Sequence, residues 1–218
     1  AHELLKEIID LQLSASNTIL SFPLFFHVIS VVDESILFED STVIVENILL
    51  DHSLNCSGFI FKEKKNERKI NKDVVDKLNI PFDKLKSIQC GADWINHNGD
   101  LIKNQDITVK NSLPHTFAFC TDTRYNIKLI EKVKGIDLLY HEATFKKENS
   151  IRAYETGHAT THEAAEIAKQ AQVKRLLIGH FSRRYKNQED LLVETKEVFK
   201  DSILAKSGLM IDFNTINS

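Results

Sequence analysis

The sequence predicts an α/β protein in which sheet layers are flanked by helices, and three observations support this class. The first half contains runs of β-branched and aromatic residues that are typical of strands. The second half alternates short apolar runs with segments of helical periodicity. The 218 residues are 42% hydrophobic, enough to bury a substantial core. We therefore expect residues 1–218 to form one domain, or most of a larger one.

The first half is predicted to begin with a helix and to continue with strands. The periodic segment starts at residue 2 without a capping residue, so we interpret the chain as opening inside a helix. Strands are expected over residues 22–32 and 35–50, the latter running into Asp51-His52. A charged segment at 62–69 precedes a short helix that is capped by Asn71 and ends before Pro81. A turn at 98–100 and a strand at 116–120 follow.

The second half is predicted to alternate helices with strands. Thr160 and Glu163 form a capping-box pattern at the start of a helix that runs to about Gln172. The other expected helices cover residues 126–135 and 187–200, and the expected strands cover residues 136–140, 175–178 and 208–213. This alternation favours strands that lie side by side with helices packed on them.

Composition narrows the functional classes. The net charge of −3 gives no overall cationic surface, so nucleic-acid binding would depend on local basic patches. The three cysteines form no CxxC pair and no disulfide framework, which favours a reducing compartment. No apolar run approaches the ~18 residues that span a bilayer, and no signal pattern opens the sequence. We expect a cytoplasmic protein without membrane contact.

Three candidate metal ligands follow predicted strand ends. His52, Asp122 and His180 each come just after such a strand. Strand ends place side chains on one rim of a sheet, and imidazole and carboxylate are the ligands that zinc prefers. A carboxylate in such a set could bridge two ions and lower the pKa of a bound water. The alternative is that each histidine is an ordinary hydrogen-bonded structural residue.

A second pair of candidates is Glu142 and His158. Each lies where a strand or loop meets the start of a helix. A carboxylate within reach of an imidazole fixes its tautomer and raises its pKa, so the pair could hold a protonated histidine ready to donate to a leaving oxygen. The alternative is that Glu142 satisfies loop amides and that Thr160 merely caps a helix.

Five ordered strings connect these residues to a known family. They are the strings at 51–59 (DHSLNCSGF), 119–123 (FCTDT), 139–145 (LYHEATF), 157–161 (GHATT) and 177–185 (LIGHFSRRY). In order and separation they resemble the motifs of ribonuclease Z, a tRNA 3′-processing endonuclease of the metallo-β-lactamase superfamily. The resemblance extends over nearly the whole chain.

The resemblance implies a four-layer αββα sandwich, two zinc ions, and endonucleolytic removal of 3′ trailers from precursor tRNA. It implies that His52, Asp122 and His180 bind metal, with Asp122 bridging both ions. It also implies that metal-activated hydroxide attacks phosphorus while Glu142 and His158 assist departure of the 3′ oxygen. His141 is expected to be structural. The partners implied are precursor tRNA and a second copy in a homodimer.

One family motif does not occur in these residues. The string His-x-His-x-Asp-His, which supplies ligands to both ions, is found nowhere in the 218 residues. We therefore expect the chain to be the C-terminal portion of the nuclease domain, with negligible activity and weak zinc binding by itself. Two alternatives stay open. One is a non-catalytic remnant that dimerises or binds RNA, and the other is a different phosphodiesterase of the same superfamily.

The expected RNA contacts lie in two places. Residues 62–105 match the position of the family's tRNA-binding arm but lack its Gly-Pro-rich signature, and Lys64, Lys65 and Arg68 could meet phosphates there. The alternative is a solvated surface, because acidic residues interrupt the basic run. Arg184 follows the predicted ligand His180 closely enough to contact a phosphate. Ala159 replaces the serine of the family's His-Ser-Thr string.

Overall fold

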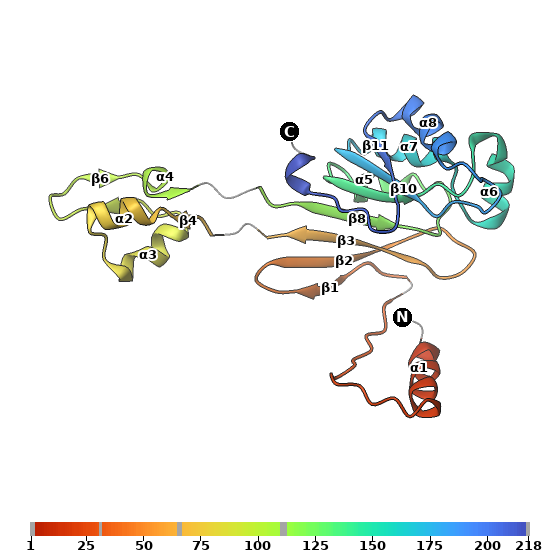
Figure 1. Ribbon diagram of the computed structural model, residues 1–218, viewed down its shortest axis with the longest axis horizontal. Coiled ribbons are helices and arrows are strands. Elements are labelled where there is room, and N and C mark those ends of the chain that lie inside the picture. The colour runs from red at the N-terminus through yellow and green to blue at the C-terminus, as the bar shows by residue number, and fades with distance from the viewer. Residues whose placement is uncertain (1–2, 31, 65–66, 110–112, 217–218) are drawn as a thin grey trace.

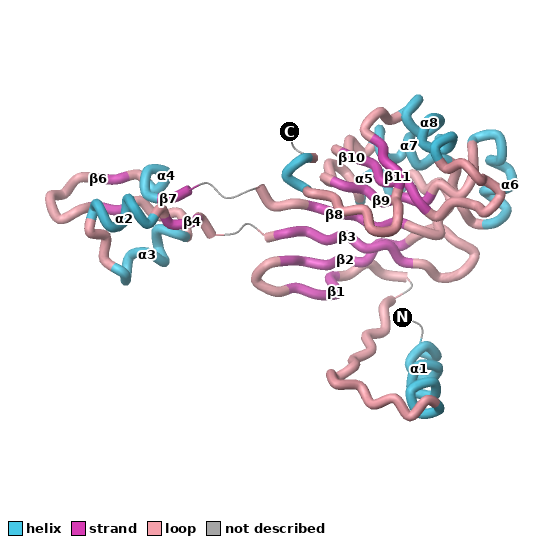
Figure 2. Tube along the Cα trace, viewed as in Figure 1, coloured by secondary structure: helices cyan, strands magenta, loops and turns pink. Residues whose placement is uncertain are grey.

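A seven-stranded mixed sheet forms the body of the protein. The computed structural model describes residues 3–30, 32–64, 67–109 and 113–216. The strands run in the order β1-β2-β3-β8-β9-β10-β11 (Figures 1 and 2). Their bounds are β1 Ile36–Glu39, β2 Val43–Leu49, β3 Ser57–Glu63, β8 Thr116–Cys120, β9 Leu138–Glu142, β10 Arg175–Gly179 and β11 Ser202–Leu204. The strands from β1 to β8 pair antiparallel, and those from β8 to β11 pair parallel.

Helices cover one face of this sheet. They are α5 Lys128–Lys132, α7 Thr161–Gln170 and α8 Glu189–Val198, while α6 Ser150–Thr156 contacts the 3-10 helix η1 Lys147–Asn149. Strand residues alternate between the two faces, so Ala118 and Cys120 of β8 join the core beneath the helices while Phe117 packs on the opposite face. The helix-covered core is completed by Leu139, Leu176, Ile178 and the apolar side of α7, which contributes Ala164, Ala165, Ile167 and Ala168. The predicted α/β class is confirmed.

The opposite face of the sheet carries aromatic side chains. Phe119 and Tyr140 stack with ring centroids 4.6 Å apart, and Phe61 and Phe117 stack at 5.8 Å. Ile216, which follows the short 3-10 helix η2 Phe213–Thr215, belongs to the buried cluster on this face. The rings of Phe117, Phe119 and Tyr140 are half-buried, and Phe61 is 37% exposed.

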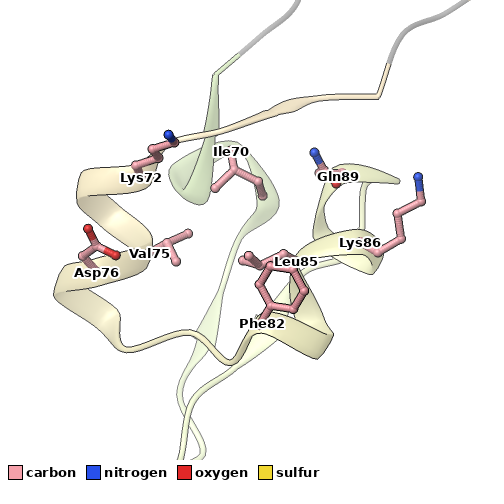
Figure 3. A pocket seen from close by; sticks show the side chains of 8 residues that line it. All are labelled: Ile70, Lys72, Val75, Asp76, Phe82, Leu85, Lys86 and Gln89. Carbon is pink, nitrogen blue, oxygen red and sulfur yellow. The ribbon is translucent and has the colours of Figure 1, made fainter.

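Residues 67–109 form a separate group of small elements, which we name the excursion module. Figure 1 shows it beyond the ends of β3 and β8. Its elements are β4 Lys69–Ile70, α2 Lys72–Leu78, α3 Phe82–Gln89, β5 Trp94–Ile95, β6 Leu101–Ile102, α4 Asn104–Ile107 and β7 Thr108–Val109. It has its own buried cluster of Ile80, Ile88 and Ile107, with Trp94 packed against it. A pocket between α2 and α3 has an apolar floor of Ile70, Val75 and Leu85 (Figure 3).

Local sequence signals agree with the structure at several elements. Helix α1 spans Glu3–Ala15, and the strand predicted at 116–120 is β8. Thr160 and Glu163 form the predicted capping box of α7, with the Glu163 N–H donating to Thr160 Oγ1 at 3.2 Å. Asn71 is the N-cap of α2, although its side chain makes no capping hydrogen bond.

Two predicted strands are wrong. The described residues of segment 22–32 form no strand, and Phe25 is 74% exposed there. β-propensity alone does not form a strand where no neighbouring strand pairs with it. The predicted last strand, 208–213, contains a turn at Gly208 with φ +79°, and the last strand is instead β11. The strand predicted at 136–140 is β9, which begins two residues later.

No helix among the described residues is both long enough and apolar enough to cross a bilayer.

Candidate metal centre

Three loops bring His52, Asp122 and His180 to one edge of the sheet. They follow β2, β8 and β10 respectively. Asp122 and His180 have φ values of +54° and +60°, a conformation that is uncommon for residues other than glycine and that clusters at functional sites. Asp122 Oδ1 lies 3.3 Å from His180 Nε2. The two side chains that the sequence places 58 positions apart are therefore in direct contact.

His158 lies among these side chains. Its ring centroid is 5.5 Å from that of His52 and 5.2 Å from that of His180. Potential ligand atoms of His52, Asp122 and His158 all lie within 4.8 Å of one another, as do those of Glu142, His158 and His180. The structure thus gathers all five predicted metal and catalytic residues into one cluster.

The cluster fits a zinc ion. Ligand atoms about 2.0–2.1 Å from a tetrahedral zinc are about 3.3 Å from one another. That is the separation observed between Asp122 Oδ1 and His180 Nε2. Imidazole nitrogen and carboxylate oxygen are also the expected zinc donors. Asp122 and His180 therefore lie at a spacing suited to zinc. His52 has its potential ligand atom close to those of Asp122 and His158, and it belongs to no group of close ligand atoms that includes His180 among the described residues.

Glu142 is the buried anchor of the cluster. It ends β9, the strand between β8 and β10, and its side chain is fully buried. It accepts hydrogen bonds from the backbone N–H groups of Thr123 at 2.6 Å and Ala159 at 3.2 Å. His158 Nδ1 lies 3.1 Å from its Oε1. The carboxylate therefore satisfies loop amides, as one interpretation of the sequence has it, and it also lies at hydrogen-bond distance from the imidazole of His158.

His141, next to Glu142, has a different environment. Its side chain is fully buried, and its Nδ1 lies 2.7 Å from the carbonyl oxygen of Glu142, to which it donates. Burial lowers the pKa of His141 below the ordinary histidine value. It belongs to neither potential ligand group of the described residues. These contacts support the structural role expected for it.

Two further residues shape the site and were not predicted from the sequence. Gly157 ends α6 with φ +84°, and a Cβ atom built there would lie 2.8 Å from His52 Cδ2. Thr144 Oγ1 lies 2.5 Å from Glu142 Oε2 and 2.9 Å from His180 Nδ1. Both residues stand in strings that carry the family resemblance, but their contacts join distant segments and leave no local pattern.

The two cysteines near the cluster are not equally accessible. Cys120 is fully buried, and burial raises the pKa of its thiol far above the ordinary value. Burial also raises the pKa of Cys56, and the charges of Asp122 and Glu142 add to that effect. Cys120 thus behaves as a small core residue.

The predicted RNA-binding residues are spread over the molecule. Arg184 lies 4.9 Å above the Phe145 ring and donates to Asn149 Oδ1 at 3.1 Å, close in sequence to His180. Lys64 forms an ion pair with Glu39 at 2.6 Å. It follows the C-terminal end of β3, whereas the cluster lies near the N-terminal end of that strand, about 20 Å away. Arg68 Nε donates to Thr108 Oγ1 at 2.5 Å in the excursion module. Lys65 lies outside the described residues.

The fold of the chain is the metallo-β-lactamase fold of known proteins. A family model described as "Beta-lactamase superfamily domain" matches residues 104–181. Two solved structures share the fold. Human tRNase Z, short form, has a TM-score of 0.58 with 21% identity and covers 96% of this chain and 64% of that one. The metallo-beta-lactamase fold protein YhfI of Bacillus subtilis has a TM-score of 0.51 with 19% identity and covers 80% and 51%.

Sequence relatives identify the family within this class. The Ribonuclease Z of Phocaeicola vulgatus is 37% identical over 215 residues, which are 99% of this chain and 70% of that protein. The Ribonuclease Z of Bacteroides thetaiotaomicron is 39% identical over 195 residues, or 89% and 62%. The chain belongs to the ribonuclease Z family. It spans roughly two thirds of the length of these curated relatives.

Proposed function

We propose that the chain is the metal-binding and proton-donating part of a zinc-dependent endoribonuclease that removes 3′ trailers from precursor tRNA. One observation carries the proposal: an imidazole nitrogen and a carboxylate oxygen lie at ligand spacing, 3.3 Å apart, beside a histidine that is held by a buried glutamate. The name Ribonuclease Z of the relatives supports an RNA substrate, and the human structural neighbour is named tRNase Z. Location in the cytoplasm and pairing into a homodimer stay predictions.

His52, Asp122 and His180 would hold the metal. Bound zinc supplies a water that is deprotonated near neutral pH and neutralises charge on phosphoryl oxygens. These three residues are a partial ligand set for two ions, since a zinc site takes four or more donors. We therefore expect these 218 residues by themselves to bind zinc weakly.

His158 would donate the proton that the leaving group needs. The buried Glu142 carboxylate lies 3.1 Å from His158 Nδ1, so it can accept a hydrogen bond from that nitrogen and orient the ring. An imidazolium can release its Nε2 proton to the 3′ oxygen when the bond between phosphorus and that oxygen breaks. The products are then a tRNA with a free 3′ hydroxyl and a trailer with a 5′ phosphate.

Contacts with the rest of the tRNA would come from two regions. Arg184 is oriented by Phe145 and Asn149, so its guanidinium is placed to meet a phosphate near the cleavage site. The excursion module would act as an arm that contacts the substrate away from that site, with Lys64 and Arg68 at its base and Lys65 as a further candidate from the sequence. Each such phosphate contact would weaken as the salt concentration rises.

The test is cleavage of a precursor tRNA that carries a 3′ trailer. These 218 residues would be compared with the same chain extended at its N-terminus to the length of its relatives by the matching segment of the Phocaeicola vulgatus protein. We expect the extended protein to cleave at the trailer junction only with zinc, and the 218 residues to show negligible cleavage. Zinc-loaded extended protein that binds precursor tRNA without cleaving it would overturn the nuclease proposal in favour of a non-catalytic RNA-binding role. Faster hydrolysis of a small phosphodiester than of tRNA would indicate a different substrate.

A further inference from the structure

The hydroxyl of Thr144 lies between Glu142 and His180 and contacts both side chains. The residue is 6% exposed and lies two positions after β9. Its Oγ1 is 2.5 Å from Glu142 Oε2, 2.8 Å from the carbonyl oxygen of His180 and 2.9 Å from His180 Nδ1. Glu142 therefore contacts His158 directly with one oxygen and reaches His180 through Thr144 with the other.

The available protons determine the direction of these bonds. A threonine hydroxyl has a single proton, whereas carboxylate and carbonyl oxygens can only accept. Each oxygen of Glu142 also accepts a backbone N–H, from Thr123 and Ala159, so the carboxylate is an acceptor throughout. The Thr144 proton is thus committed to an oxygen. His180 Nδ1 must then supply its own proton to Thr144 Oγ1.

We propose that Thr144 is a positioning residue that holds His180 in the tautomer protonated at Nδ1, so that the lone pair of Nε2 faces Asp122. In that state the lone pair of His180 Nε2 faces Asp122 Oδ1 at 3.3 Å. The two atoms repel each other, and a cation bound by both would stabilise the arrangement. The other tautomer would place a proton on Nε2 and let it donate to Asp122, which blocks the nitrogen as a ligand. Thr144 thereby selects the ligand-competent form.

This inference deepens the proposed function, because it concerns the same metal-binding cluster. It can nevertheless be tested without catalysis. Histidine ring nitrogens give distinct ¹⁵N signals when protonated and unprotonated, so NMR of the 218-residue chain labelled with ¹⁵N-histidine reports the tautomer. Spectra would be recorded without metal at about pH 8.5, roughly two units above the ordinary histidine pKa. The H180Q variant would assign the His180 signals.

Three variants distinguish a positioning role of Thr144 on His180 from a general loss of stability. Thr144→Val keeps the shape and removes the hydroxyl, while Thr144→Ser keeps the hydroxyl. Thr161→Val is the matched control, because Thr161 is fully buried and its Oγ1 has no hydrogen-bond partner among the described residues. We expect the proton on Nδ1 in the wild type, T144S and T161V, and on Nε2 in T144V. We also expect T144V alone to lose about 10- to 100-fold in zinc affinity, as is usual when a group that orients a metal ligand is removed.

The outcomes distinguish this inference from the proposed function. A wild-type His180 that carries its proton on Nε2 would overturn the inference, as would a T144V variant with an unchanged tautomer. If the tautomers behave as expected but the extended protein fails to cleave precursor tRNA, the nuclease proposal fails and the positioning role stands.

Discussion

Gly157 places the end of α6 directly against the His52 ring, and replacing it by alanine is a sensitive test of the metal site. The new Cβ would lie 2.8 Å from His52 Cδ2 and 3.1 Å from Nε2. Ordinary contact begins at 3.4 Å, so the ring must move by about 3.4 − 2.8 = 0.6 Å. In addition, alanine at φ +84° costs about 1–2 kcal/mol of folding free energy.

A second glycine separates these two effects. Gly135 has φ +69°, and a Cβ there would meet nothing within 4 Å. Gly135→Ala should therefore lose a similar ~1–2 kcal/mol of stability without touching the site. Gly157→Ala should lose that amount and also displace His52, lowering zinc affinity about tenfold or more.

Two measurements distinguish the loss of stability from the displacement of His52. Urea unfolding compares the stabilities of the two variants, and competition with a chromophoric chelator compares their zinc affinities. Equal zinc affinities for Gly157→Ala and Gly135→Ala would refute the reasoning, because they would show that the position of the His52 ring does not matter for the metal.

Three more predictions concern buried groups. Glu142→Gln should lower cleavage by the extended protein at least about 100-fold, measured as trailer release, since the amide would disturb the hydrogen bond that orients His158. Unchanged cleavage would exclude proton donation by this pair. Burial would raise the pKa of Asp137, but its hydrogen bonds, led by the one from Lys174, outweigh burial and lower it. Asp137→Asn should therefore cost stability above about pH 4, and the difference from wild type should shrink as pH falls below that value, as followed by urea unfolding. Cys120 should resist alkylation in the native protein while the exposed Cys90 reacts, and mass spectrometry of labelled peptides checks this.

Sequence patterns correctly predicted the helices and strands that are encoded by a few neighbouring residues. The capping box at Thr160 and the apolar strand at 116–120 are of this kind, and both are present. The three-residue strand β11 was missed, because its apolar run is too short to distinguish from a loop without knowing that it pairs with β10. The segment 22–32 fails in the opposite way, since it has strand-forming residues but no pairing among the described residues.

The candidate site could be predicted only as a list of side chains at strand ends. Strand ends indicated where His52, Asp122 and His180 lie along the chain, but not their separations. The contacts of Thr144 with His180 cross 36 positions of sequence, and the approach of Gly157 to His52 crosses more than 100. Such contacts depend on how the loops pack, and no short-range pattern encodes that packing.

The parallel register of β8, β9 and β10 explains why Asp122, Glu142 and His180 lie close together. Cys120 pairs with His141, and Gly179 pairs with Glu142, so the ends of β8, β9 and β10 are level at one edge of the sheet. Asp122 and His180 then lie one or two residues past their strands, on either side of Glu142. A slip of one residue in either pairing would turn alternate side chains to the opposite face and remove Glu142 from the cluster. The geometry of the site is therefore a property of the three-strand register, and the loops that follow need only adopt the left-handed conformation seen at Asp122 and His180.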